Sequence, residues 1–314
     1  MQQLFITMRN TFARAVIAER KYKGRKELGQ PLLGNRHGNA AGSGAIVMWL
    51  LLASLLSVLF GFAMAASPHL QSRLLPAAGL ALSFALLAWF LRGVSRSGAA
   101  AGALIALTVT DVGGTPIFAV LVVVFVLTWL ATRLGRERKQ RLGIAERPRG
   151  RNGAQVLANL WASAMAIVLS LVLPWSYAFR VAALAALAEA ASDTVSSEIG
   201  EAFGKRAWLI TTAREVPVGT DGGVSAVGIF AGLLAAAVIA LMGMLVVSTS
   251  DAYIVALCGF AGMICDSFLG AWFERRGWMT NNLVNFSSTC LAALLGFVIA
   301  RCCSGADSSS LFAR

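Results

Sequence analysis

Two carboxylates stand one helical turn apart in an otherwise apolar stretch of the chain. Glu189 and Asp193 are four residues apart within segment 177–199, so an α-helix places them on one face. Carboxylates so placed repel each other and require a cation, a proton or a basic partner. Acidic groups inside a membrane cost about 2.5–3.5 kcal/mol each to insert and are functional by default. The pair therefore indicates a functional site, and interhelical hydrogen bonds or salt bridges are the alternative.

Two further acids are candidates for the same site. Glu198 follows Asp193 by five residues, which rotates it about 140° away on a regular helix, so it joins the site only if the helix bends near Ser196 and Ser197. Asp266 lies near the end of a later apolar segment. Carboxylates such as these could hold a divalent metal, and Mg²⁺ is the expected ion where phosphates are present. The candidate metal ligands are Glu189, Asp193, Glu198 and Asp266.

A glycine-rich turn precedes another apolar segment. It reads Gly219-Thr220-Asp221-Gly222-Gly223-Val224-Ser225. Glycines expose backbone N–H groups, and a helix N-terminus follows, a combination that suits phosphate oxygens. The hydroxyls could add hydrogen bonds and Asp221 could hold a metal. The run is not a Walker A motif, and a tight loop between two spans explains it equally well.

Basic and amide side chains supply further candidate phosphate ligands. Arginine pairs with phosphate in a bidentate manner and lysine acts as a point charge, although topogenic charge is a sufficient explanation for most basic loops. The amides of Gln155 and Asn159 at the start of one span are not topogenic and carry more weight. The candidates are Arg151, Lys205, Arg214, Asn159, Asn282 and Asn285.

The elements that must position these residues are transmembrane helices. The 314 residues are 57% hydrophobic and only 13% charged, with a mean hydropathy of +0.71, which excludes a soluble globule and a disordered chain. We predict an all-α, polytopic transmembrane helix bundle of about nine spans. Gly113-Gly114-Thr115-Pro116 supplies a sharp turn between the third span and the fourth. The spans are 45–66, 74–91, 98–114, 116–132, 154–173, 177–199, 223–247, 251–273 and 283–301.

The net charge of +12 fits the same arrangement. If the N-terminus is cytoplasmic, 23 of the 27 Lys and Arg residues fall in cytoplasmic segments, as the positive-inside rule expects. Topology therefore explains the basic excess, and no nucleic-acid partner is expected. The carboxylates, the glycine turn, the basic loops and the amides then share the cytoplasmic half of the protein, next to an apolar wall open to lipid.

The chain divides into three parts. Residues 1–44 form a basic cytoplasmic segment, either an interfacial amphipathic helix followed by a linker or a loosely ordered tail. Residues 45–302 form the transmembrane domain, and 303–314 a polar tail. The five cysteines include no C-x-x-C pair and the chain has two histidines, so no zinc site is expected. No cleavable signal peptide is expected, because the first long apolar run follows a basic stretch of more than forty residues.

Three runs of sequence resemble an integral membrane family called domain of unknown function 92. These runs are 193–200, 209–212 and 216–225, and the stretches 97–99, 155–159 and 281–285 are also similar to it. The family includes plant phytyl-phosphate kinase and transmembrane protein 19. The resemblance covers about residues 75–300, whereas the first 70 residues look divergent.

The resemblance implies a polyprenyl-phosphate kinase activity, and we expect the protein to lie in a bacterial inner membrane. An isoprenyl monophosphate such as phytyl or geranylgeranyl phosphate would take a phosphoryl group from a nucleotide, CTP being favoured. Asp193 and Glu198 would then bind Mg²⁺, with Glu189 and Asp266 as further ligands. The turn 219–225 would hold nucleotide phosphates, and Arg151, Lys205 and Arg214 would neutralise charge during phosphoryl transfer.

Two other classes of function use the same residues. A transporter or channel for a small ion or an anionic metabolite also places acids inside the membrane, but it predicts access from both sides and an inverted repeat. A nucleotidyltransferase that forms a CDP-lipid needs the same phosphate and metal sites. The gathering of polar groups on one side favours the kinase over the transporter.

Overall fold

The computed structural model describes residues 43–66, 71–145 and 149–311. The chain separates into two units, 1–44 and 45–314, and nearly all of the described residues belong to the second. The predicted interfacial helix and linker of the N-terminal segment lie outside the described residues. The end of the polar C-terminal tail, 312–314, also lies outside them.

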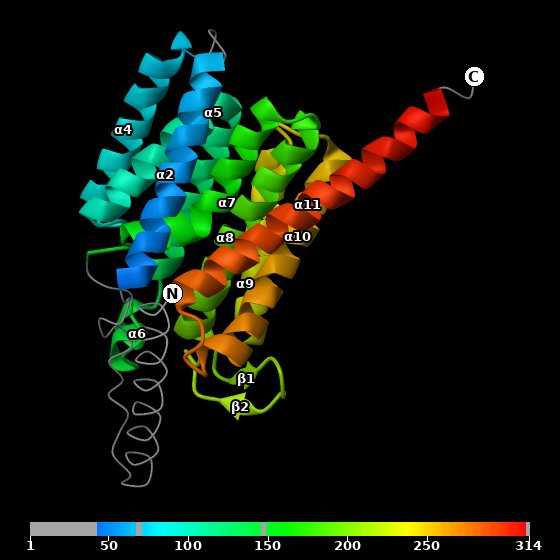
Figure 1. Cartoon of the computed structure of the whole chain (residues 1–314). Helices are drawn as coiled ribbons and strands as arrows, with labels where there is room; N and C mark the ends of the chain where they lie inside the picture. The colour runs from blue at the N-terminus through cyan, green and yellow to red at the C-terminus, as the bar shows by residue number, and fades with distance from the viewer. Residues whose placement is uncertain (1–42, 67–70, 146–148, 312–314) are drawn as a thin grey trace, which may run out of the picture. The chain divides into compact units, whose positions relative to one another are not determined.

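The described residues form a helical bundle with a small sheet at one end (Figure 1). The strands are β1 (Ala207–Leu209), β2 (Glu215–Val216) and β3 (Gly223–Val224), in the antiparallel order β2-β1-β3. The helices are α2 (Ser43–Ala66), α4 (Leu74–Phe90), α5 (Arg96–Arg133), α6 (Arg136–Arg141), α7 (Gly153–Val172), α8 (Ser176–Phe203), α9 (Ala226–Gly243), α10 (Thr249–Leu269), the π-helical turn η1 (Gly270–Glu274) and α11 (Asn281–Leu311).

Helices occupy all nine segments that the sequence predicts as spans. In the described part of the chain, five helices are long and apolar enough to cross a membrane, namely α5, α7, α9, α10 with η1, and α11. Two shorter apolar helices, Met48–Phe62 within α2 and α4, accompany them. The prediction of a polytopic helical bundle is therefore confirmed at this level, and the three-stranded sheet is the part that it missed.

Helix α5 is a hairpin of two helices. Gly114 interrupts it with a non-helical backbone (φ 82°, ψ 173°), and Pro116 follows. The end of α5 returns to the turn just before its start, because Trp129 Nε1 and the Arg133 guanidinium both donate to the carbonyl of Leu91, at 3.2 and 2.6 Å. Each half is about 27 Å long at 1.5 Å per residue. The predicted turn at 113–116 is confirmed.

Helix α8 lies at the centre of the bundle (Figure 1). It packs against α5, α7, α9, α10 and α11, and most of its residues are buried. Its many alanines let the neighbouring backbones approach closely. A Cβ atom added at Gly259 of α10, for example, would lie 2.5 Å from the Ala188 Cβ. Because α8 meets protein on several sides, it tolerates acidic residues that a lipid-facing helix would exclude.

The loops with most of the described basic residues meet at one end of the bundle, called here the basic end. They are 91–95, 134–145 with 149–152, 204–225 and 270–280. Contacts between them include the bridge of Val94 with Arg151, the bonds from Arg138 to the carbonyls of Ala202 and Gly204, and the packing of Gly222 on Ala271. At the opposite end, the Tyr177 hydroxyl donates to Asp251 Oδ2 at 2.6 Å.

Candidate functional site

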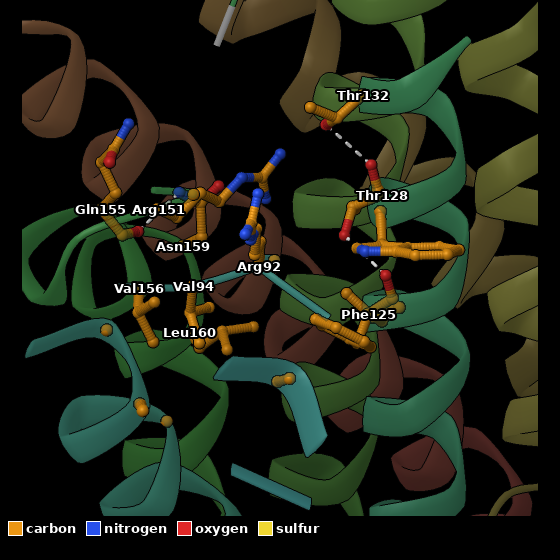
Figure 2. Close-up of a pocket in the computed structure, with 18 of the residues that line it drawn as sticks. Arg92, Val94, Phe125, Thr128, Thr132, Arg151, Gln155, Val156, Asn159 and Leu160 are labelled. Carbon is orange, nitrogen blue, oxygen red and sulfur yellow. Dashed lines mark hydrogen bonds between the residues drawn. The ribbon is translucent and has the colours of Figure 1, made fainter. Parts of the chain in front are cut away.

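A cavity of about 230 Å³ opens between α4, α5, α7 and α8 near the basic end. Its inner wall is apolar and is built by residues such as Phe84, Ala88, Leu121, Val124, Phe125 and Leu160. Its rim is polar and carries Arg92, Arg133, Arg136, Arg151, Gln155 and Asn159. Figure 2 shows Arg92 and Arg151 reaching toward the space between Asn159 on one side and Thr128 and Thr132 on the other. The cavity suits a ligand with an anionic head and an apolar body.

Four arginines on one rim form the main cationic feature of the site. Arg133 stacks over the Trp129 ring, with its guanidinium carbon 4.2 Å from the ring centroid. Arg92 has a positive φ of 54°, a conformation that costs non-glycine residues of order 1–3 kcal/mol and often marks functional sites. Of the four, sequence reasoning selected Arg151 alone. It assigned Arg92, Arg133 and Arg136 only to topology, since a single sequence carries no signal that separates a topogenic arginine from a ligand-binding one.

The amides at the start of α7 serve both structure and site. Asn152 and Gln155 form a capping box in which each side chain accepts from the other residue's backbone N–H, at 3.0 and 2.8 Å. One turn later, Asn159 Oδ1 accepts from Asn285 Nδ2 of α11 at 3.2 Å. The structure thus brings Asn285 against Asn159, which lines the cavity, although Asn285 is not itself a lining residue. Asn282 lies one turn earlier on α11 and is half-buried.

Three of the four predicted acidic ligands gather beside these amides. Asp193 of α8 is within hydrogen-bonding reach of Asp266 of α10 and within electrostatic range of Arg151. The Ser288 hydroxyl of α11 donates to Asp266 Oδ2 at 3.1 Å. Glu189 is 1% exposed, and its carboxylate lies within electrostatic range of Asp193 and within hydrogen-bonding reach of Ser288. We call Glu189, Asp193 and Asp266 the acidic cluster.

The acidic cluster offers the kind of donor atoms that Mg²⁺ prefers. Carboxylate and hydroxyl oxygens are ligands that Mg²⁺ accepts, and this ion takes several further ligands from water and phosphate. The buried carboxylate of Glu189, beside that of Asp193, is a charge that a cation or a proton would satisfy. Across the described residues, however, no group of three or more His, Cys, Asp or Glu side chains is arranged to hold a metal ion. The magnesium site therefore stays a prediction.

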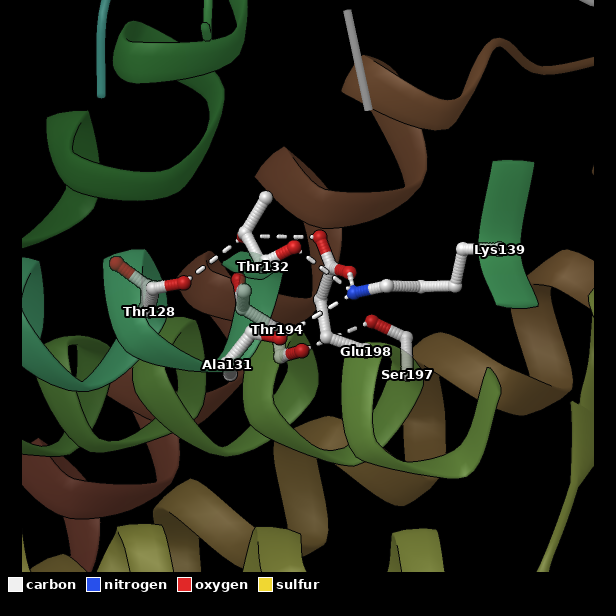
Figure 3. A network of polar contacts seen from close by, with 7 residues as sticks. All are labelled: Thr128, Ala131, Thr132, Lys139, Thr194, Ser197 and Glu198. Carbon is white, nitrogen blue, oxygen red and sulfur yellow. Dashed lines mark hydrogen bonds and ion pairs between the residues drawn. The ribbon is translucent and has the colours of Figure 1, made fainter. Parts of the chain in front are cut away.

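Glu198 lies in a different environment (Figure 3). Helix α8 runs unbroken from Ser176 to Phe203, so the bend that would turn Glu198 toward Asp193 is absent from this described segment. Glu198 Oε2 instead pairs with Lys139 Nζ of α6 at 2.6 Å, and its Oε1 accepts from the Thr132 hydroxyl at 2.9 Å. Both oxygens are engaged within the protein, so we leave Glu198 out of the acidic cluster.

The glycine turn packs against neighbouring loops. A Cβ at Gly222 (φ 70°) would lie 2.4 Å from the Ala271 backbone nitrogen, and one at Gly219 (φ 82°) would lie 3.0 Å from Ile144. Ser225 caps α9 by accepting from Gly228 N, and the Thr220 hydroxyl donates to Pro217 O. The tight-loop alternative thus explains these residues.

Several predicted phosphate ligands lie outside the cavity. The lining found among the described residues includes none of 219–225, and it lacks Lys205 and Arg214, whose side chains are exposed. Within that turn, Asp221 and Gly223 are half-buried. Phosphate binding by these residues stays a prediction.

Fold and site together define a polytopic integral membrane protein with an amphiphilic cavity at one end. Comparison with known families makes this more specific. Residues 79–293 match the family described as Integral membrane protein DUF92, and the chain belongs to that family. The family resemblance inferred from 193–225 is confirmed.

Several relatives share this sequence over much of their length. The uncharacterized membrane protein sll0875 of Synechocystis is 32% identical over 191 residues, which cover 58% of this chain and 73% of that protein. The uncharacterized membrane protein MJ0933 of Methanocaldococcus jannaschii is 34% identical over 184 residues, covering 56% and 72%. Protein VTE6, chloroplastic, of Arabidopsis thaliana is 31% identical over 217 residues, covering 66% of this chain and 65% of VTE6. No solved structure matches.

Proposed function

We propose that this protein is a membrane-embedded kinase that phosphorylates an isoprenyl monophosphate. The observation that carries the proposal is the cavity, whose apolar wall and rim of four arginines adjoin a cluster of buried carboxylates. A lipid with a phosphate head matches the wall and the rim. The carboxylates suit the charge neutralisation that phosphoryl transfer requires.

In the proposed reaction an oxygen of the lipid monophosphate forms a bond to the terminal phosphorus of a nucleoside triphosphate. The bond from that phosphorus to its bridging oxygen breaks, and the nucleoside diphosphate leaves with the bonding electrons. The protein has little covalent chemistry to do, because such transfers depend on positioning and charge neutralisation. Arg92 and Arg151 would bind the lipid phosphate, and Asn159 would orient it through its amide.

Asp193 and Asp266 of the acidic cluster would hold Mg²⁺ together with water and phosphate oxygens, and the ion would supply charge neutralisation when it is bound. Asp193 is the central ligand in this proposal, since it lies near both Asp266 and Arg151. Asp266 is held in place by the Ser288 hydroxyl. Glu189 would provide a buried negative charge behind these two side chains.

The relatives support the isoprenoid substrate. The family resemblance includes plant phytyl-phosphate kinase, and the chloroplast protein VTE6 of Arabidopsis thaliana is 31% identical to this chain over 217 residues. Because the alignment covers 65% of VTE6, the transfer of its activity to this protein is part of the proposal. Phytyl and geranylgeranyl phosphates are the substrates we favour, with CTP as the donor.

We also infer nine membrane crossings with a cytoplasmic N-terminus in a bacterial inner membrane. The fold-back of α5 at Gly114 turns one long helix into two antiparallel spans. The loops that gather at the basic end are those that the positive-inside rule assigns to the cytoplasm. A cytoplasmic nucleotide would then reach the same end as the arginine rim.

The test is an assay of the purified, folded protein with labelled CTP or ATP, Mg²⁺ and farnesyl, geranylgeranyl or phytyl phosphate. We expect a labelled lipid diphosphate. Asp193→Asn should abolish turnover without loss of folded protein, whereas Glu215→Gln, an exposed change on β2, should leave it intact. Absence of transfer with every donor and lipid would refute the kinase.

The same assay separates the kinase from a CDP-lipid nucleotidyltransferase. Mass spectrometry of the product distinguishes a diphosphate ester from a CDP-lipid. Transport is the weaker alternative, because the polar groups of the site gather near the basic end of the bundle.

A further inference from the structure

The buried ion pair between Lys139 and Glu198 lies directly behind the rim of the cavity. Lys139 is 1% exposed and Glu198 is 8% exposed. Lys139 Nζ donates to Glu198 Oε2 at 2.6 Å and to the carbonyls of Thr132 and Ala131 at 2.9 and 3.2 Å. An ammonium group has three donors, so all of its hydrogen-bonding capacity is used (Figure 3).

The two carbonyls that Lys139 binds belong to the last turn of α5. Carbonyls at a helix C-terminus lack partners within the helix, and a lysine that binds them fixes the direction in which the chain leaves. The Thr132 hydroxyl adds a second link, since it shares its hydrogen between Glu198 Oε1 at 2.9 Å and the Thr128 carbonyl at 2.8 Å. Glu198 therefore holds the end of α5 through Thr132 and through Lys139.

This corner of the chain carries half of the arginine rim. Thr132, Arg133 and Arg136 line the cavity, and Lys139 follows Arg136 by one turn of α6. The corner turns at Gly135, whose φ is 62°, and a Cβ there would lie 2.5 Å from the Ala202 Cβ of α8. Arg138 bonds the carbonyls of Ala202 and Gly204 at 2.9 and 2.6 Å.

A buried ion pair is a poor source of stability alone, because desolvation offsets its attraction, and apolar residues of similar size often replace it without loss. Its directed bonds do fix geometry. We propose that Lys139 and Glu198 are positioning residues that hold Thr132, Arg133 and Arg136 where the rim binds the phosphate of an isoprenyl monophosphate. The ligand class rests on the function proposed above.

The test compares binding of farnesyl phosphate with binding of farnesol, which lacks the phosphate, in detergent-purified full-length protein. Glu198→Gln should weaken farnesyl phosphate binding about tenfold, the effect of one charge-assisted bond, and leave farnesol binding unchanged. In turnover assays KM should rise more than kcat falls. Asp193→Asn provides the contrast, since it should lose kcat while retaining lipid binding.

A double variant separates positioning from stability. Lys139→Met with Glu198→Met replaces the pair by apolar side chains and should keep the protein folded. We expect it to lose phosphate-dependent binding like Glu198→Gln, although it unfolds at no lower temperature than the wild type. If Glu198→Gln weakens the binding of farnesol and of farnesyl phosphate equally, the ion pair only maintains the structure and does not position the arginines. The same conclusion follows if the double variant binds farnesyl phosphate as tightly as the wild type.

Other outcomes bear on the ligand and on the chemistry. Loss of kcat at unchanged KM in Glu198→Gln would instead make Glu198 a catalytic or metal-binding residue and overturn the inference. If the wild-type protein binds farnesyl phosphate but transfers no phosphoryl group, the proposed kinase activity is refuted. The binding constants of the variants then decide by themselves whether Lys139 and Glu198 position the arginines. A wild-type protein that binds neither lipid would overturn both.

Discussion

Arg151 connects the cavity with the acidic cluster. Its backbone is fixed by the bridge to Val94, and its carbonyl accepts from Ser95 N at 2.9 Å. Its side chain is half-buried, lines the cavity and lies within electrostatic range of Asp193. An arginine held between a phosphate site and a carboxylate can bind the phosphate without free rotation, which lowers the entropy lost on binding.

Arg151→Gln should therefore weaken the binding of isoprenyl monophosphate about ten- to a hundredfold, since a charge-assisted hydrogen bond contributes about 1.5–3 kcal/mol. The dissociation constant of farnesyl phosphate measures this effect. Arg276→Gln is the matched control, because Arg276 is exposed and lies over the Trp278 ring. Equal effects of the two substitutions would mean that only the overall positive charge attracts the lipid.

The Lys139–Glu198 pair allows a prediction on stability. Lys139→Met alone leaves the Glu198 carboxylate buried without its cation, which should cost about 3–5 kcal/mol and lower the thermal unfolding temperature clearly. The matched control is Arg206→Gln, which breaks an exposed pair with Glu215 at 3.9 Å that contributes about 0–1 kcal/mol. If both variants lower the unfolding temperature by a similar small amount, then the Glu198 carboxylate becomes hydrated or protonated without a large loss of stability when Lys139 is removed.

At the scale of elements, the loop 219–225 depends on close packing against η1. Gly222 and Gly277 both have positive φ, at 70° and 73°, but only a Cβ at Gly222 meets neighbouring atoms, those of Ala271. Gly222→Ala should therefore lower the free energy of unfolding by about 1–3 kcal/mol more than Gly277→Ala does. Both substitutions strain a backbone with positive φ, but only the new methyl group at position 222 overlaps with neighbouring atoms.

Thermal unfolding of the two glycine variants in the same detergent measures the difference. Limited proteolysis of 204–225 should also speed up in Gly222→Ala alone. Equal unfolding temperatures would show that the loop shifts away from η1 without loss. If turnover also falls in Gly222→Ala, the position of this loop matters to the reaction.

Hydropathy gave the boundaries of several long helices closely, whereas α11 runs to Leu311, ten residues beyond the predicted span 283–301. The predicted span 154–173 corresponds to α7 at Gly153–Val172, and the turn at 113–116 corresponds to the break at Gly114. The sheet of β1, β2 and β3 escaped prediction because strands of two or three residues carry no measurable period. Helix α6 escaped for a similar reason, since its six residues are all polar or charged.

For the whole molecule, the gathering of the basic loops predicts a topology that cysteine labelling can check. In a background without the five native cysteines, Glu215→Cys on β2 should react with an impermeant reagent only from the cytoplasmic side. Ser250→Cys, exposed at the start of α10, should react only from the other side. Labelling of both positions from one side would refute the proposed orientation.

The sequence by itself determined the class of protein, the helical segments and the family. Apolar length, charge asymmetry and the run 193–225 are local properties, so they can be read without coordinates. It also identified Asp193, Glu189 and Asp266, because a carboxylate among apolar residues is conspicuous wherever the helix lies.

Tertiary structure alone decided which polar residues share a site. Glu198 stands in the same motif as Asp193, yet Lys139 holds it from 59 residues away. Arg92 lies in the α4–α5 turn, whereas Arg133 and Arg136 lie at the corner between α5 and α6. They meet Arg151 only because these two regions and the start of α7 converge. Such contacts depend on how helices pack, and the spacing of residues along one helix contains no information about the partner that another helix brings.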